Sequence, residues 1–151
     1  MQKKLVYVAH PFGNIKENQL KIDAIMEELV LTDTNNAYAS PIHNFGFMYL
    51  EGDEYVKGLN ICLRLLQKCD VLVLAGNWRT SRGCNAEFTL AKKTGIPIYT
   101  LDEWKLVIRK EEKSYLDLAK EAINNMTEED FVKITKLYLK KFSKGPENNK
   151  E

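Results

Sequence analysis

The sequence predicts an α/β protein in which an open parallel sheet carries helices on both faces, followed by a C-terminal helical extension. Two observations predict this class. Short β-rich apolar runs alternate with segments of helical periodicity, as in sheets whose parallel strands are joined by right-handed helical crossovers. The run VLVLAG, residues 71–76, is apolar on both faces, which is typical of a central strand covered by helices on each side.

The chain begins with one expected strand and one expected helix. LVYVA, residues 5–9, is a short β-rich run that ends at HPFGN, a turn signal. A helix is expected next, because apolar residues recur on one face with a period of about 3.6 residues. These residues are Ile22, Ile25, Met26 and Leu29.

The next segment contains a second candidate strand and a second helix. NAYASP, residues 36–41, is the strand, and the polar and aromatic stretch IHNFGFMYLEGD, residues 42–53, is expected to be a loop. A stripe of helical spacing then predicts the buried face of the helix. It consists of Tyr55, Leu59, Cys62 and Leu66.

The clearest strand, residues 71–76, is followed by the loop NWRTSRG. A helix from about Gly83 to Thr94 and a strand IPIYTL, residues 96–101, complete the alternation. In open parallel sheets, ligands bind outside the carboxyl ends of the strands, where the strand order reverses. HPFGN and NWRTSRG both follow strands, so we expect the two loops to face one crevice.

From Asp102 onward the sequence is charged and amphipathic, and the start signal MTEED precedes the last helical pattern. Apolar residues such as Tyr115 and Ile123 fall on one face, so we expect these helices to cover the domain or a second subunit. Nothing in them suggests chemistry. The expected organisation is an α/β domain over residues 1–102, a helical extension over 103–143 and a disordered tail over 144–151.

The charges of the chain nearly cancel, because 22 lysines and arginines oppose 21 acids for a formal net charge of +1. This balance argues against a nucleic-acid polymer as the main partner, since such binders usually carry a basic face. Three cysteines without a CxxC pair and two distant histidines predict neither a disulfide framework nor a metal site. The N-terminal apolar run is too short for a signal peptide or membrane span, so we expect a reduced cytoplasmic setting.

Ser81 stands just before the helix that begins near Gly83, where its hydroxyl can cap the helix. Arg82, Gly83 and Cys84 would then present free backbone N–H groups, an arrangement that suits a phosphate. An ordinary serine cap, with a glycine that eases a tight turn, explains the same residues. The loop matches neither GxGxxG nor the GxxxxGKS/T phosphate loop, so we expect no dinucleotide or ATP and no other cofactor.

Glu87 is an acid among apolar positions, because it shares one helix face with Leu90, Ala91 and Thr94. A carboxylate on a face that packs on the sheet loses hydration, which is costly unless it is compensated. Such a group is best tolerated at the mouth of a crevice, where it can act as a base or a nucleophile. The alternative is a boundary glutamate whose stem packs while its carboxylate reaches water.

Three segments together resemble the nucleoside 2-deoxyribosyltransferase-like superfamily, which includes deoxyribonucleoside 5'-monophosphate N-glycosidases. The segments are VYVAHPFG, LLQKCDVLVLAG and SRGCNAEFTLAKKTGIPIY. The similarity covers roughly residues 4–101. It implies a three-layer, flavodoxin-like or Rossmann-like fold and a small-molecule nucleotide or nucleoside partner, with neither a membrane nor a nucleic-acid polymer involved. Members are often oligomeric, so we expect a homo-oligomer.

The resemblance implies roles for single positions. Glu87 matches the glutamate that attacks C1' of the sugar and displaces the base, with the logic of a retaining glycosidase. Ser81 matches a serine that receives the 5'-phosphate in nucleotide-acting members, and Tyr7 and the HPFGN turn match the loop that encloses sugar and phosphate. The expected substrate-binding residues are Tyr7, His10, Gly13, Asn14, Asn77, Arg79, Ser81, Arg82 and Gly83.

One position departs from the family pattern. The family usually has an aspartate eight residues before the aspartate of the CD pair, and here Cys62 stands in its place. A thiol, with a reference pKa of about 8.5, is a weaker proton donor to a departing base. In one reading the protein is an N-glycosidase or deoxyribosyltransferase whose acid comes from elsewhere, with Asp53, Glu54 and His43 as candidates. In a second reading it only binds or senses a nucleotide, and in a third it is a scaffold whose C-terminal helices form the interface that matters.

Overall fold

The computed structural model describes residues 3–142, and only the backbone of residues 138, 141 and 142. The chain divides into two compact units, Met1–Ile108 and Arg109–Glu151, and each is described by itself. The disordered tail expected over residues 144–151 lies outside the described residues. The boundary expected at residue 102 stays a prediction.

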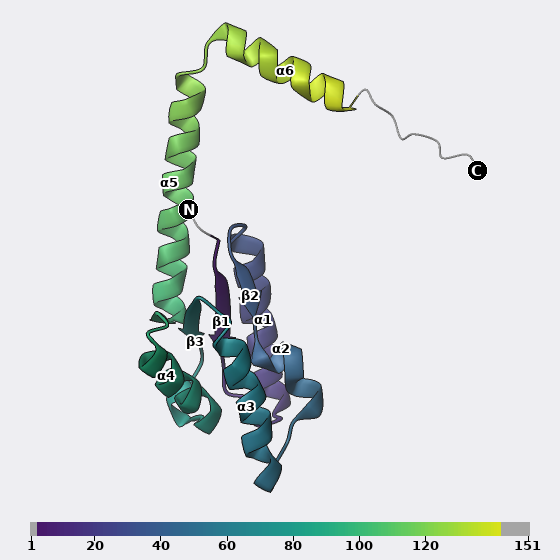
Figure 1. The fold of residues 1–151 in the computed structure, drawn as a ribbon, viewed down its shortest axis with the longest axis vertical. Helices are drawn as coiled ribbons and strands as arrows, with labels where there is room; N and C mark the ends of the chain where they lie inside the picture. The colour runs from purple at the N-terminus through teal and green to yellow at the C-terminus, as the bar shows by residue number, and fades with distance from the viewer. Residues whose placement is uncertain (1–2, 143–151) are drawn as a thin grey trace, which may run out of the picture. The chain divides into compact units, whose positions relative to one another are not determined.

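The first unit is built around a four-stranded sheet in which all strands are parallel, so the predicted fold class is confirmed. The strands lie in the order β2-β1-β3-β4, and the first three are visible in Figure 1. Each falls inside a run that the sequence predicts as a strand. They are β1 (Leu5–Ala9), β2 (Ala37–Ala39), β3 (Val71–Leu74) and β4 (Ile98–Thr100).

Helices alternate with the strands. They are α1 (Lys16–Thr32), α2 (Pro41–Phe45), α3 (Tyr55–Leu66), α4 (Arg82–Thr94) and α5 (Leu101–Asn124). Helical periodicity predicts α1, α3 and α4, and α5 follows the last strand. The short helix α2 differs from the loop expected over residues 42–53, which also contains two single 3-10 turns. Pro41 occupies the first turn of α2, where its fixed φ and its missing N–H are both compatible with a helix.

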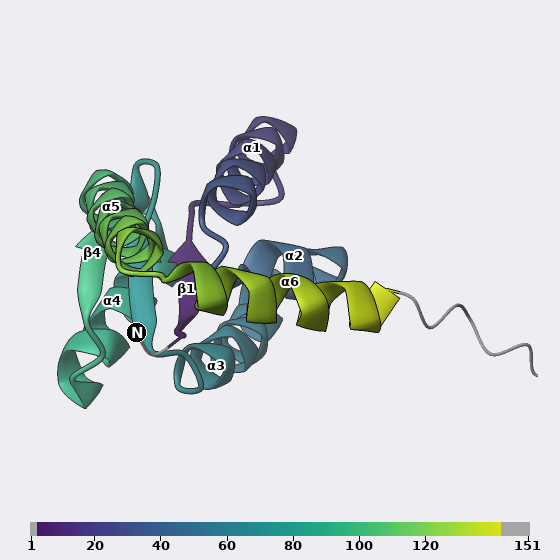
Figure 2. The same cartoon turned by 90° about the horizontal axis from the view of Figure 1, so that it is seen from above.

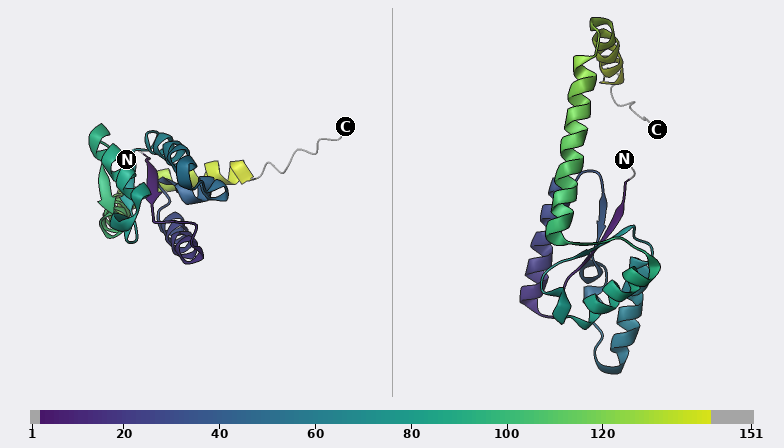
Figure 3. Two further views of the ribbon diagram at one scale, coloured as in Figure 1. Left: turned by 90° about the horizontal axis from the view of Figure 1, so that it is seen from below. Right: turned by 90° about the vertical axis from the view of Figure 1, so that its left-hand side faces the viewer.

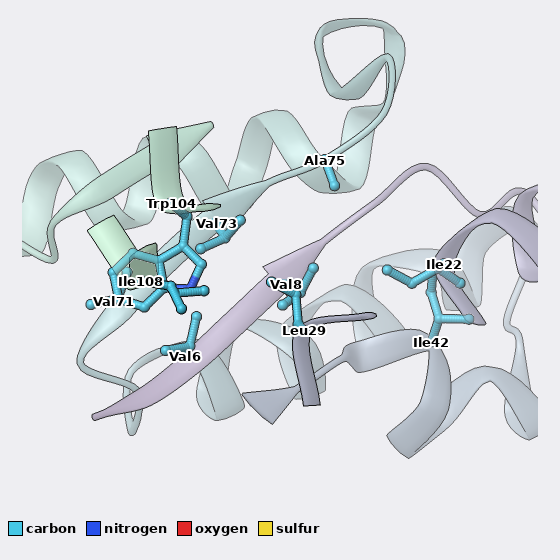
Figure 4. Packing of buried hydrophobic residues seen from close by; sticks show 10 residues of the cluster. All are labelled: Val6, Val8, Ile22, Leu29, Ile42, Val71, Val73, Ala75, Trp104 and Ile108. Atoms are coloured by element: carbon cyan, nitrogen blue, oxygen red, sulfur yellow. The ribbon is translucent and has the colours of Figure 1, made fainter. Parts of the chain in front are cut away.

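The sheet is covered on both faces, which produces the three layers. On one face, the side chains of β1 and β3 pack against α1, α2 and the start of α5, and Figure 4 shows Trp104 over this cluster. On the other face, Tyr7 and Leu72 belong to a cluster with residues of α3 and α4. Figure 2 shows α1 and α3 on opposite sides of β1. The central strand β3 is buried along its whole length, as its uninterrupted apolar run predicts.

The strand order fixes where a ligand can enter. From β1 the chain moves to β2 on one side, and it then returns past β1 to β3 and β4 on the other side. The order therefore reverses between β1 and β3, whose carboxyl ends are Ala9 and Leu74. Connections leave these two ends in opposite directions, which opens a crevice at this point in sheets of this type.

The second unit consists of helix from Arg109 to Asn124, which continues α5, and of α6 (Glu128–Phe142) after a short turn (Figure 3). Its apolar side chains are exposed, with Tyr115 at 59% and Ile123 at 65%. None of the helices between residues 3 and 142 has the length and apolar character of a membrane-spanning segment.

Candidate functional site

Glu87 is buried on the inner face of α4. Only 4% of the residue is exposed, and its neighbours along the helix stripe, Cys84 and Ala91, are also buried. The local sequence holds the helix in place at both ends. Ser81 caps the first turn, as predicted, and Gly95 ends the helix in the left-handed conformation with φ +76°. The alternative of a boundary glutamate, with a packed stem and a carboxylate in water, is therefore excluded for Glu87.

The carboxylate of Glu87 accepts a hydrogen bond from a residue that is distant in the sequence. The hydroxyl of Tyr7, in the middle of β1, donates a hydrogen bond of 2.6 Å to Oε1 of Glu87. Burial raises the pKa of Glu87 to about 7, although the bond from Tyr7 acts in the opposite direction. Burial and the nearby carboxylate raise the pKa of Tyr7 well above its usual value, so the phenol stays the donor.

Glu87 lies on the wall of a cavity of about 130 Å³ at the carboxyl ends of the first three strands. Three of the lining residues, His10, Phe12 and Gly13, follow β1, whereas Pro41 and Ile42 follow β2. The remaining wall comes from the end of α2 and the segment after it, from α3, and from Ser81 and α4. Its residues are Phe45, Gly46, Met48, Tyr49, Leu50, Tyr55, Gly58, Leu59, Ile61, Cys62, Ser81, Gly83 and Cys84.

His10 forms the part of the wall that adjoins the ends of β1 and β3. Its Nδ1 lies 2.7 Å from the carbonyl oxygen of Pro11. A carbonyl can only accept, so Nδ1 carries a proton and neutral His10 has its lone pair on Nε2. Gly76, with φ +62°, lets the ring approach the backbone, because a Cβ at this position would lie 2.6 Å from Nε2. Burial lowers the pKa of His10.

The amino end of α4 forms another part of the wall. The hydroxyl oxygen of Ser81 accepts the N–H of Cys84 at 3.3 Å, so the expectation that this N–H is free is wrong. The N–H groups of Arg82 and Gly83 have no hydrogen-bond partner among residues 3–142. The hydroxyl of Tyr55 is close, because a Cβ on Gly83 would lie 3.4 Å from it. Donors from two helices therefore meet at this end of the cavity.

Cys62 lies on α3 and lines the same cavity as Glu87. Burial, followed by the nearby Glu87 carboxylate, raises the pKa of the Cys62 thiol to about 11. Cys84 is affected in the same way, with its pKa raised to about 12. Both thiols are therefore protonated and poor proton donors near neutral pH.

Residues 4–100 match the model of a family described as a domain of unknown function, DUF4406. The chain belongs to this family. No curated protein matches the sequence significantly.

Solved structures similar to this chain include the following two. A crystal structure of a conserved protein from Enterococcus faecalis V583 has a TM-score of 0.52 at 16% sequence identity. The match covers 65% of this chain and 62% of that protein, so the chain spans less than two thirds of its length. A 2-deoxyribosyltransferase from the psychrotolerant bacterium Bacillus psychrosaccharolyticus has a TM-score of 0.49 at 17% identity, over 64% of this chain and 70% of that one. At such identities the likeness to the Enterococcus protein shows a shared fold alone.

The expected substrate-binding residues of this DUF4406 protein divide into those at the cavity and those away from it. His10, Gly13, Ser81 and Gly83 line the cavity, and Tyr7 contacts the lining residue Glu87 through its hydroxyl. The other four are exposed and do not line it. They are Asn14, Asn77, Arg79 and Arg82.

The guanidinium groups of the two arginines each lie over an aromatic ring, and neither arginine lines the cavity. Arg79 is 4.6 Å from the centre of the Trp78 ring, and Arg82 is 4.9 Å from the centre of the Tyr55 ring. The phenol of Tyr55 belongs to the cavity wall, so Arg82 lies one side chain away from it.

The expected substrate-binding residues include none from residues 41–58, which supply much of the cavity wall. This wall is largely apolar and aromatic, and Phe12 and Tyr49 form an edge-to-face pair with ring centres 5.4 Å apart. The concentration of aromatic residues in the expected loop was the available signal. A local pattern could not show that this loop folds back over the end of β1.

The three acids considered as replacements for an aspartate at position 62 do not line the cavity. His43 lies 3.0 Å from a carboxylate oxygen of Asp23, and Glu54 forms an ion pair of 2.7 Å with Lys57. Asp53 is exposed on a 3-10 turn. Between residues 3 and 142, no cluster of three or more His, Cys, Asp or Glu side chains could hold a metal ion.

Proposed function

We propose that the protein cleaves the bond between base and sugar in a (deoxy)nucleoside 5'-monophosphate, with Glu87 as the nucleophile. One observation carries the proposal: the buried carboxylate of Glu87 lies on a cavity wall and accepts the hydroxyl of Tyr7 at 2.6 Å. Burying a carboxylate has a high free-energy cost. If the cavity binds a sugar whose C1' is electron-poor, the buried carboxylate can attack that carbon, which would explain why it is buried there.

The chemistry follows from the carboxylate and its single hydrogen-bond donor. In the ionised state, the Oε1 atom of Glu87 is fixed by Tyr7, and the Oε2 atom keeps its lone pairs for attack on C1'. The carbon–nitrogen bond then breaks, and a glycosyl ester of Glu87 forms. Water completes hydrolysis by attacking the ester, whereas a second base at the same place would complete a transfer. In both cases the sugar carbon keeps its configuration.

The groups at the amino end of α4 favour a substrate that carries a phosphate. The free N–H groups of Arg82 and Gly83 point outward from the start of the helix, where the helix dipole favours an anion. The Ser81 hydroxyl accepts one hydrogen bond, from Cys84, and its own hydrogen remains available to a phosphate oxygen. Arg82 adds positive charge within reach.

The test is release of free base from a panel of ribonucleoside and deoxyribonucleoside 5'-monophosphates, followed by chromatography. We expect the wild type to release base from at least one of them. Glu87→Gln keeps the size of the side chain and removes the nucleophile, so it should abolish release. The matched control is Glu27→Gln, because Glu27 is exposed on α1 and does not line the cavity. Release by Glu87→Gln at the wild-type rate would overturn the nucleophile assignment.

A second candidate function is nucleotide binding without efficient catalysis. Cys62 favours it, because its protonated thiol lines the cavity together with Glu87. The superfamily that this sequence resembles usually has an aspartate at the position of Cys62. Titration calorimetry distinguishes the two functions. Heat of binding for a monophosphate, with no base released from any member of the panel, would support a binding protein.

A further inference from the structure

We propose that His10 exchanges the proton that base release requires, through its Nε2 atom. This inference rests on the proposed function, since it names the group that protonates the departing base. His10 lines the cavity together with Glu87, and the reference pKa of its imidazole is near neutral pH.

The other proton-carrying groups of the cavity are poorly suited to this step. The pKa of the Cys62 thiol is raised to about 11 and that of the Cys84 thiol to about 12, so both thiols stay protonated near neutral pH. Burial raises the pKa of the Tyr55 phenol, which also lines the cavity, above the usual value of about 10. A general acid works best when its pKa is close to the working pH, and imidazole meets this condition.

The orientation of the His10 ring is fixed from one side. Nδ1 donates to the Pro11 carbonyl at 2.7 Å, so Nε2 is the atom that gains and loses the second proton. Within residues 3–142, Nε2 has no hydrogen-bond partner. The one buried side-chain nitrogen or oxygen atom without a partner in the same residues is the Ser40 hydroxyl, so Nε2 is not fully enclosed. His10 lines the cavity, and we take the accessible surface of Nε2 to be on that side.

The absence of a side chain at Gly76 makes this placement of Nε2 possible. Any Cβ there would lie within 2.9 Å of two ring atoms of His10, and the φ of +62° is one that other residues rarely adopt. Gly76 follows β3, and His10 follows β1, so the pair lies at the point where the strand order reverses.

The proton returns to its starting place in one turnover. In the first step, a Glu87 oxygen bonds to C1', the C1'–N bond breaks, and its electron pair takes the proton from Nε2 of His10. In the second step, water attacks C1' and gives its proton to Nε2, while the bond between C1' and Glu87 breaks and restores the carboxylate. Atoms and charges balance, and no further reactant is required.

The pH dependence reflects all charged groups around His10. Burial lowers its pKa, the bond to Pro11 raises it, and Lys21 on α1 lowers it. The other titratable groups on the cavity are Glu87, Cys62, Cys84, Tyr49 and Tyr55. Because the active form needs protonated His10 together with ionised Glu87, release of an ordinary base should pass through a maximum below about pH 7.

The test compares two leaving groups. Wild type, His10→Gln and His10→Ala are assayed at one slightly acidic pH with adenosine or deoxyadenosine monophosphate and with the matching 7-methylguanosine monophosphate. The methylated base leaves without an added proton, because it already carries a positive charge. His43→Ala is the matched control, since His43 lies outside the cavity. Thermal unfolding of each variant reports whether it folds.

We expect both His10 variants to lose about a hundredfold or more in rate with the adenine nucleotide and to keep most of their rate with the methylated one. Added imidazole should restore part of the activity of His10→Ala, and the decline at high pH should vanish in His10→Gln. Equal losses with both substrates, or no loss with either, would overturn the role of His10 while leaving the proposed function intact. A wild type that releases neither base overturns the proposed function and the role of His10 with it.

Discussion

The hydroxyl of Tyr7 and the carboxylate of Glu87 meet at 2.6 Å, although 80 positions separate the two residues in the sequence. Tyr7 is fully buried in the middle of β1, and Glu87 is buried on α4. The contact joins the central sheet to the helix whose amino end carries Ser81. It therefore fixes the carboxylate relative to both the crevice and the end of the cavity that we propose for the phosphate.

Tyr7→Phe should raise the pKa of Glu87 above about 7, because the hydrogen bond from Tyr7 acts to lower it. A hydrogen bond to a charged group contributes about 1.5–3 kcal/mol, which corresponds to roughly one to two pKa units. At neutral pH the carboxylate would then be mostly protonated, and base release should fall by about tenfold or more. The pKa can be followed by carbon NMR of the carboxyl group. Tyr99→Phe is the control, because Tyr99 lies outside the cavity, and an unchanged Glu87 pKa in Tyr7→Phe would contradict the prediction.

The raised pKa of Glu87 should make stability fall as the pH rises. The unfolded chain loses the proton near the usual value of 4.5, whereas the folded protein keeps it up to about pH 7. Between these values the folded state binds more protons, so the free energy of unfolding decreases by roughly 3 kcal/mol and then levels off. Glu87→Gln removes this dependence. Denaturant unfolding of both proteins over this pH range should give a difference in free energy that grows with pH, and a constant difference would refute it.

Gly76→Ala should be more damaging than an alanine at another glycine with positive φ. The new Cβ would meet Nε2 of His10 at 2.6 Å, in addition to the strain of φ +62°. Gly52 is the matched control, because its φ is +56° and a Cβ there has nothing within 4 Å. Strain alone costs about 1–3 kcal/mol. We expect Gly76→Ala to lower the midpoint of thermal unfolding further than Gly52→Ala and to reduce base release as the ring of His10 shifts.

Ser81→Ala should affect both stability and the preference for a phosphate. Loss of the cap on α4 costs about 1 kcal/mol without ligand. In the wild type, a monophosphate should stabilise the fold more than the matching nucleoside at equal concentration, according to RT ln(1 + [L]/Kd). The variant should lose most of this difference in thermal shift. Ser114→Ala, on the exposed part of α5, serves as control, and equal shifts for both ligands in the wild type would refute the phosphate site.

The exposed apolar side chains of the second unit lead us to expect self-association. Phe131 is 66% exposed and Leu137 is 69% exposed on α6, and short helices are marginal without a packed face. Light scattering coupled to size exclusion should therefore give a mass above that of one chain. Phe131→Ser combined with Leu137→Ser should reduce the mass. Leu31→Ser is the control, because Leu31 is 73% exposed on α1, outside this unit. A monomeric wild type would contradict the prediction.

The local features were predictable because each depends on residues close together in the sequence. Short runs of strand-forming residues placed all four strands, the spacing of Ile22 and Leu29 placed the inner face of α1, and Ser81 marked the start of α4. The position of Glu87 on the buried stripe of α4 followed from the same periodicity. The helix at residues 41–45 was missed, because one turn is too short to show a period.

The sequence by itself thus determined the fold class, the strands and the placement of a carboxylate on a buried helix face, since local spacing decides these features. The tertiary structure alone decided that Tyr7 donates to that carboxylate, that residues 41–58 supply much of the cavity wall, and that His10 lines the cavity while its ring lies against Gly76. These relationships depend on which strand lies beside which. The strand order β2-β1-β3-β4 results from packing over long sequence separations, and no short pattern records it.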